Sequence, residues 1–212
     1  MTNRPGCFIA FEGIEGAGKS TQIGRLAATL RARGREVVQT LEPGGTTFGQ
    51  LLRQLVMQPT DDPPVALTEL LLYLADRAQH IEQVIRPALA RGAIVLSDRF
   101  SGSTIAYQGY GRGLDLELVK GLDAAVRRGL WPDRTLLLDC PLERGLGRAT
   151  GDDRMQREKV EFHRRVQNGF HALAAGDPSW TVVSTEPPPD EVAVAVLAAV
   201  DAILSPCPSP TS

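Results

Sequence analysis

Three glycines, a lysine and a serine within eight residues have the types and spacing needed to hold a phosphate chain. Residues Gly13 to Ser20, GIEGAGKS, fit the phosphate-loop pattern G-x-x-x-x-G-K-S/T. The glycines let backbone N–H groups curl around a phosphate, and a helix that begins at the lysine adds its dipole. Lys19 would supply charge to the outer phosphates, and Ser20 an oxygen to Mg²⁺. The predicted nucleoside triphosphate site comprises Gly13, Ile14, Glu15, Gly16, Ala17, Gly18, Lys19, Ser20 and Thr21.

A second polar group, Asp98-Arg99-Phe100, follows the apolar run 93–96. An acid at the end of a neighbouring strand can reach the Mg²⁺ shell of a phosphate loop. Arg99 is not needed for the metal, so it suggests a second anionic ligand close to the first. The alternative is a surface turn that contains an ion pair.

Two further groups could recognise an aromatic ligand. The first group lies on one predicted helix. Its members are spaced i, i+3, i+4 and i+7 and therefore share one face: Tyr73, Asp76, Arg77 and His80. A tyrosine ring beside a guanidinium can stack on a planar base and bond its carbonyl. The alternative is a solvated face with an Asp–Arg pair. The stripe predicted to face the core comprises Leu67, Leu70, Leu71, Leu74, Ala75 and Ala78.

The other group lies in the segment 103–108, STIAYQ. One helical turn would bring the hydroxyls of Ser103 and Thr104 close to the ring of Tyr107. The alternative is a capped turn with a packed tyrosine.

These groups must be positioned by strands that alternate with helices. We predict strands at about 7–12, 36–41, 93–97, 135–139 and 181–184. We predict helices at about 19–33, 46–57, 67–90 with a break near His80 or Ile81, 103–107, 115–128, 142–148, 156–175 and 190–204, and a glycine-rich loop at 108–113. The alternation indicates an α/β fold, with five parallel strands and helices on both faces. Ligands in such folds bind outside the carboxyl ends of the strands.

Length and composition limit the classes of function. The chain of 212 residues suits one α/β domain, predicted at 1–204, with a short lid at about 148–157 and a disordered tail at 205–212. A net charge of −2 argues against a broad nucleic-acid or membrane-surface footprint. No apolar run reaches membrane-spanning length, and the first strand leaves no room for a signal peptide. Three cysteines without paired spacing indicate reduced thiols, so we expect a cytoplasmic protein.

Taken together, these stretches resemble the bacterial thymidylate kinases, a family of phosphate-loop nucleoside monophosphate kinases. The resemblance rests on FIAFEGIEGAGKST, EPGGT, YLADR, VIRPAL, DRF, STIAYQGYGRG, WPDRTLLLD and the segment 153–154. It implies the phosphate-loop kinase fold, a homodimer, and Mg²⁺-dependent transfer of the γ-phosphate of ATP to dTMP in dTTP biosynthesis.

The resemblance also implies roles for individual residues. The implied dTMP-binding residues are Glu15 at the sugar 3′-hydroxyl, Arg53 and Arg99 at the phosphate, Tyr73 and Arg77 at the base, Glu42, and Ser103, Thr104, Tyr107 and Gln108 at the base and sugar. Ser20 and Asp98 should serve Mg²⁺, directly or through water. Lys19 and Arg99 should be catalytic. The phosphate loop itself contains no arginine, so a lid arginine should complete the catalytic set, with Arg154 as first choice and Arg148 as second.

Two other readings remain open at this point. The first is a kinase of another nucleotide or nucleoside, such as dUMP, because a methyl group is read only by pocket shape. The second is a non-catalytic phosphate-loop switch. Switch proteins that bind GTP usually carry an N-K-x-D motif, and the sequence contains none.

Overall fold

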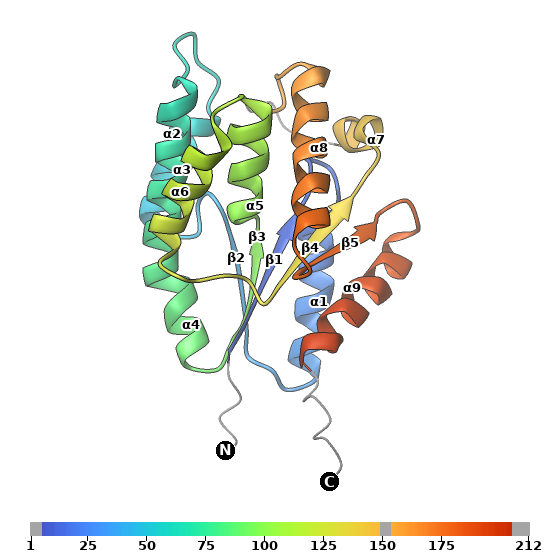
Figure 1. Cartoon of the computed structure of the whole chain (residues 1–212). Coiled ribbons are helices and arrows are strands. Elements are labelled where there is room, and N and C mark those ends of the chain that lie inside the picture. Colours follow the sequence, from blue (N-terminus) through green and yellow to red (C-terminus); the bar gives the residue numbers. More distant parts are fainter. Residues whose placement is uncertain (1–5, 149–153, 205–212) are drawn as a thin grey trace.

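A parallel sheet forms the centre of the protein (Figure 1). The structure is a computed structural model, and it describes residues 6–148 and 154–204. Among these residues the sheet has five strands in the order β2-β3-β1-β4-β5, which confirms the predicted fold class. The strands are β1 (Cys7–Glu12), β2 (Val37–Leu41), β3 (Ile94–Asp98), β4 (Arg134–Asp139) and β5 (Trp180–Ser184). The predicted tail at 205–212 and the lid residues 149–153 lie outside the described ranges.

Helices connect the strands, and Figure 1 shows α2, α3 and α6 side by side at one end of the sheet and α1 next to α9. The helical elements are α1 (Lys19–Ala32), α2 (Thr47–Met57), α3 (Ala66–His80), the π-helical segment η1 (Ile81–Ile85), α4 (Arg86–Ala90), α5 (Ser101–Thr104), the π-helical segment η2 (Ile105–Gly111), α6 (Leu116–Arg127), α7 (Leu142–Arg148), α8 (Val160–Gly176) and α9 (Pro189–Leu204). None of the helices in these ranges combines the length and apolarity needed to cross a bilayer.

Strand β1 is buried on both faces, as expected for the centre of a parallel sheet. Phe8 and Ala10 belong to a cluster with residues of η1 and α4. Ile9 and Phe11 belong to the larger core with residues of α1, α8 and α9. This packing fixes the end of β1, where the phosphate loop begins.

The faces of α3 differ from the prediction. Three of the four residues predicted to share the face opposite the core are buried: Asp76 and His80 are each 0% exposed and Arg77 is 2% exposed, while Tyr73 is half-buried. Of the stripe predicted to face the core, Leu70 and Leu74 are buried, whereas Leu67, Leu71, Ala75 and Ala78 are exposed. The polar face can be buried because carboxylates and a hydroxyl from other elements pair with it. The predicted break of this helix coincides with η1, where the hydrogen-bonding pattern changes.

Two predicted boundaries are wrong. The loop predicted at 108–113 is helical as far as Gly111, because its glycines permit close packing: a Cβ on Gly111 would lie 2.8 Å from the ring of Phe162. The helix predicted from 156 begins only at Val160, after turns at 154–157. Both errors lie where contacts distant in sequence decide the local structure.

Candidate active site

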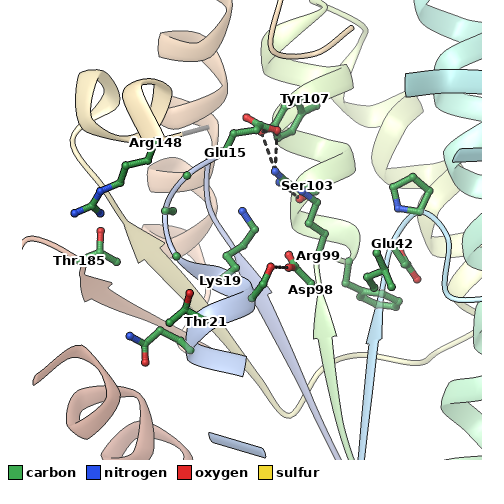
Figure 2. A pocket seen from close by; sticks show the side chains of 18 of the residues that line it. Glu15, Lys19, Thr21, Glu42, Asp98, Arg99, Ser103, Tyr107, Arg148 and Thr185 are labelled. Carbon is green, nitrogen blue, oxygen red and sulfur yellow. Dashed lines mark hydrogen bonds and ion pairs between the residues drawn. The ribbon is translucent and has the colours of Figure 1, made fainter. Parts of the chain in front are cut away.

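A cavity of about 680 Å³ lies beyond the carboxyl ends of β1, β2 and β3. It brings together predicted residues from both ligand sites: Glu15, Gly16, Ala17, Gly18, Lys19, Ser20, Thr21, Glu42, Arg53, Tyr73, Arg77, Asp98, Arg99, Ser103, Thr104, Tyr107, Gln108 and Arg148. Figure 2 shows Arg148, Thr185 and Thr21 on one side of this space and Glu42 on the other. The cavity is therefore long enough to have two distinct ends.

The phosphate loop takes a conformation that requires glycine. Gly16 has a φ of 67°, and a Cβ there would lie 2.1 Å from the carbonyl oxygen of Gly145 in α7. Lys19 Nζ donates to the carbonyl oxygens of Gly13 and Ile14 at 3.0 and 2.8 Å. Burial, together with the nearby Arg99, lowers the pKa of Lys19 to about 8. The predicted Gly13 and Ile14 thus hold the lysine through their carbonyl groups.

The two predicted metal residues are in direct contact. Ser20, at the start of α1, donates from its hydroxyl to Asp98 Oδ2 at 2.8 Å (Figure 2). Asp98 is the last residue of β3. An oxygen pair of this kind suits Mg²⁺, which is usually bound by one or two protein oxygens, water and phosphate.

Arg99 joins the phosphate loop to the second half of the cavity. Its Nη1 donates to the carbonyl oxygen of Gly13 at 3.0 Å and to Ser103 Oγ at 2.9 Å. Its Nη2 donates to Glu15 Oε1 at 2.8 Å, and the hydroxyl of Tyr107 donates to the same carboxylate (Figure 2). Burial alone would raise the pKa of Glu15, but Arg99 and Lys19 outweigh burial and lower it. A charged guanidinium therefore lies directly beside the phosphate loop.

A buried carboxylate that the sequence did not single out lies behind this group. Glu12, the last residue of β1, is 0% exposed. Its Oε1 accepts from the backbone N–H groups of Phe100 and Ser103 at 2.9 and 3.0 Å, and its Oε2 contacts Ser103 Oγ at 2.5 Å. Burial raises the pKa of Glu12 to about 7, against these hydrogen bonds. Glu12 thereby fixes Ser103, which in turn contacts Arg99.

At the other end of the cavity, Glu42 holds two side chains of α3. Its Oε2 accepts from Arg77 Nε at 2.8 Å, and its Oε1 lies 2.7 Å from His80 Nδ1. The other ring nitrogen of His80 contacts Thr40 Oγ1 at 2.6 Å. Glu42 was predicted as a dTMP ligand, but in this arrangement both of its oxygens serve to position α3.

The remaining predicted acceptor residues surround the same end. Arg53 Nη1 donates to the carbonyl oxygen of Pro43 at 2.9 Å. Gln108 Nε2 donates to Glu69 Oε1 at 2.8 Å. Because the carboxylate can only accept, this bond assigns the amide nitrogen and leaves the carbonyl oxygen of Gln108 as the group available to a ligand. Burial, together with Glu69, raises the pKa of the Tyr73 hydroxyl, which stays neutral.

The two predicted lid arginines occupy different places. Arg148 lines the main cavity, and its Cβ lies 3.1 Å from the position of a Cβ on Gly16. Arg154 lines a separate cavity of about 260 Å³, where it pairs with Glu69 and donates to the carbonyl oxygen of Val56. In this conformation Arg148 is beside the phosphate loop, and Arg154 is on the α2–α3 side.

Several lining residues were missed by the sequence reasoning. They are Gln22, Leu41, Pro43, Met57, Phe100, Gln156, Thr185, Pro187, Pro189 and Val192. Those from Thr185 onward follow β5, so the rule that ligands bind at the carboxyl ends of parallel strands could have identified them. The others are apolar or neutral side chains without a distinctive pattern.

Comparisons with known proteins find relatives of one family. The family model described as thymidylate kinase matches residues 11–196. A thymidylate kinase of Solidesulfovibrio magneticus is 48% identical over 208 residues, covering 93% of this chain and 100% of that relative. A thymidylate kinase of Synechococcus sp. (strain JA-2-3B'a(2-13)) is 51% identical over 195 residues, covering 92% and 94%. The crystal structure of thymidylate kinase from Ehrlichia chaffeensis superposes with a TM-score of 0.79 at 33% identity, covering 92% of this chain and 99% of that one.

Proposed function

The chain belongs to the thymidylate kinase family, and on that premise we propose that it transfers the γ-phosphoryl group of ATP to dTMP. The products are dTDP and ADP, and the reaction is a step of dTTP biosynthesis. The observation that carries the proposal is the bond from Arg99 Nη1 to the carbonyl oxygen of Gly13. It puts the cation for the acceptor phosphate beside the loop for the donor phosphates, within one cavity.

The residues suit phosphoryl transfer between two anions. The acceptor is a phosphate whose second pKa is about 6, so it is largely ionised at neutral pH and needs no general base. The reaction instead needs cations that bring the two anions together and stabilise charge in the transition state. Lys19 and Arg99 supply two of them, and both side chains line the cavity.

Mg²⁺ is part of the proposal. Ser20 and Asp98 would hold it, directly or through water, and their 2.8 Å contact already brings two suitable oxygens together. Bound there, the ion neutralises charge on the donor phosphates. The family relationship supports ATP dependence, and Mg²⁺ is the divalent ion that fits these ligands.

The base end of the cavity fits a pyrimidine with a carbonyl at position 4. Arg77 offers an N–H donor, and Gln108 offers its carbonyl oxygen as an acceptor. Such a donor and acceptor match the C=O and N–H groups of a thymine or uracil edge. Tyr73, which lines the same cavity, would stack on the base with its ring. Glu15 and Tyr107, joined by a hydrogen bond of 2.8 Å, would contact the sugar, and Arg53 and Arg99 the phosphate.

For the lid we propose Arg148 as the first catalytic candidate and Arg154 as the second. The support is the position of Arg148 in the main cavity, beside the phosphate loop. The adenine of ATP would lie at the same end, near Thr185 (Figure 2).

We also propose that residues 1–204 form one catalytic domain that pairs with a second copy. Support for the homodimer comes from an apolar face on two adjacent helices. Phe48, Leu51 and Leu55 of α2 and Leu67 and Leu71 of α3 are exposed, and the two helices pack against each other. The buried free thiols of Cys7 and Cys140 support the expected cytoplasmic location.

An ADP-release assay over a panel of acceptors tests the substrate assignment. With dTMP, dUMP, dCMP, dGMP and thymidine at equal concentrations, dTMP should give the highest kcat/KM. Turnover of another acceptor without turnover of dTMP would overturn the proposal.

A further inference from the structure

Arg77 is held between two buried carboxylates from different elements. Its Nε donates to Glu42 Oε2 at 2.8 Å, and its Nη1 donates to Asp123 Oδ1 at 2.7 Å. The side chains are 2%, 4% and 1% exposed, respectively. Glu42 follows β2, whereas Asp123 lies in α6, 46 residues after Arg77 in the sequence. One guanidinium thus joins the sheet, α3 and α6.

Two such bonds fix the plane of the guanidinium as well as its position. Arg77 lies over the ring of Phe100, with its Cζ 5.0 Å from the ring centroid. Since Nε and Nη1 are both engaged by carboxylates, Nη2 is the corner of the group left for a ligand. Arg77 lines the main cavity, so this corner is the donor that an acceptor base would meet.

Asp123 is itself rigidly held. Its Oδ2 accepts from Arg127 Nε at 2.6 Å, and its Oδ1 also accepts from Ser101 Oγ at 2.9 Å. Arg127 lies against the ring of Trp131, 3.3 Å from its centroid. The carboxylate therefore has little freedom to rotate, and its bond to Arg77 holds the guanidinium in one orientation.

Asp123 is one of the two carboxylates that pair with Arg77, and it also pairs with Arg127. Glu42 and Asp123 carry one negative charge each, and Arg77 and Arg127 one positive charge each. Burial alone would lower the pKa of Arg77, but the two carboxylates outweigh burial and raise it, so the guanidinium stays charged. Asp123 is absent from the lining of the cavity, and any effect it has on a ligand acts through Arg77.

We propose that Asp123 is a positioning residue for acceptor recognition, which orients Arg77 so that Nη2 reads a base carbonyl and rejects an amino group at the same place. The inference rests on the proposed function, because it assigns a base to the cavity. An amino group on the base would face a donor with another donor, and a buried donor without an acceptor is costly. Selectivity for dTMP over dCMP should therefore depend on Asp123.

The test is Asp123→Asn, which keeps the shape but removes the charge and one acceptor oxygen. We expect KM for dTMP to rise at least tenfold and KM for ATP to change less than twofold. The ratio of kcat/KM for dTMP to that for dCMP should fall at least tenfold. A merely structural role would lower thermal stability and leave this ratio unchanged, which would overturn the proposal.

A double-mutant cycle shows whether Asp123 acts through Arg77. In an Arg77→Met background, Asp123→Asn should raise KM for dTMP less than twofold further. If the increases in KM for dTMP caused by the two single substitutions instead multiply in the double variant, the proposal is contradicted. Asp133→Asn serves as the control, since it removes the charge of an exposed carboxylate outside this group, which accepts from the backbone N–H of Phe8. It should leave the dTMP to dCMP ratio unchanged.

Ser101→Ala gives a milder version of the test if Asp123→Asn does not fold. It removes only the hydroxyl that donates to Asp123 Oδ1, and it should raise KM for dTMP about threefold with KM for ATP unchanged. An unaltered KM for dTMP in a folded Ser101→Ala protein would then overturn the inference. Failure of the wild-type protein to phosphorylate dTMP would instead overturn the proposed function.

Discussion

The hydroxyl of Ser20 donates a hydrogen bond to Asp98 Oδ2 at 2.8 Å, which joins the start of α1 to the end of β3. The two residues are 78 positions apart in the sequence, yet adjacent parallel strands bring them to the same edge of the sheet. This contact aligns the two oxygens proposed to serve Mg²⁺.

Replacing Asp98 with Asn should weaken the response to Mg²⁺. We expect the Mg²⁺ concentration that gives half-maximal activity to rise about tenfold, because a charged oxygen is removed from the ion's shell. A titration of activity against Mg²⁺ at saturating ATP and dTMP measures this shift. Asp201→Asn is the control, since Asp201 forms a surface ion pair with Arg33. An unchanged Mg²⁺ requirement in Asp98→Asn would remove Asp98 from the metal site.

The two lid arginines should differ in their effects. Arg148→Ala should lower kcat about 10²- to 10³-fold with little change in KM, because under the proposal it removes a cation that stabilises charge in the transition state. Arg154→Ala should mainly raise KM for dTMP, because its partner Glu69 also holds Gln108. Steady-state kinetics with both substrates separates the two outcomes. A large fall in kcat for Arg154→Ala alone would restore Arg154 as the catalytic arginine.

Glu12 should make folding stability depend on pH. Its pKa is raised from 4.5 to about 7 in the folded protein, so the folded state binds more protons between these values. The stabilisation is complete below pH 4.5 and is lost as the pH rises through 7. By the cited shift, it amounts to at most about 3 kcal/mol.

Urea unfolding of wild type and Glu12→Gln at pH 5 and pH 8 measures the contribution of Glu12 to the free energy of unfolding. Glutamine keeps hydrogen-bonding groups at the site but does not titrate. The wild type should therefore lose more unfolding free energy than the variant between the two pH values. Equal losses would show that Glu12 does not titrate in this range.

The apolar face on α2 and α3 predicts how the chain assembles. Leu51 is 57% exposed in the middle of this face. Light scattering should give the wild type twice the chain mass of 22.9 kDa and Leu51→Glu a single chain mass. Val194→Glu, on α9, alters an apolar residue elsewhere that is 69% exposed and should leave the dimer intact. A monomeric wild type would contradict the proposed assembly.

The sequence predicts best where chemistry is local. The phosphate loop and the Asp98-Arg99 pair carry short patterns, and the strands that precede them are continuous apolar runs. The structure brings all of these to one edge of the sheet.

Prediction fails where distant partners reverse a local expectation. Arg77 and His80 were predicted to lie on the face opposite the core, but they are buried because Glu42 and Asp123 pair with them across 35 to 46 residues. Gly109 and Gly111 read as a loop, but they allow η2 to pack closely against neighbouring side chains. No periodicity within a single helix contains this information. Asp123 could not be singled out for the same reason.

The most direct test of the central claim follows the γ-phosphate of ATP. The protein is incubated with ATP labelled at that position, Mg²⁺ and dTMP, and the nucleotides are separated. Lys19→Ala serves as the inactive reference, and Lys120→Ala, which alters an exposed lysine paired with Glu117, as the active one. The account predicts that the label passes to dTDP in wild type and Lys120→Ala but not in Lys19→Ala. Label that appears only as free phosphate, or that stays in ATP with the wild type, would contradict it.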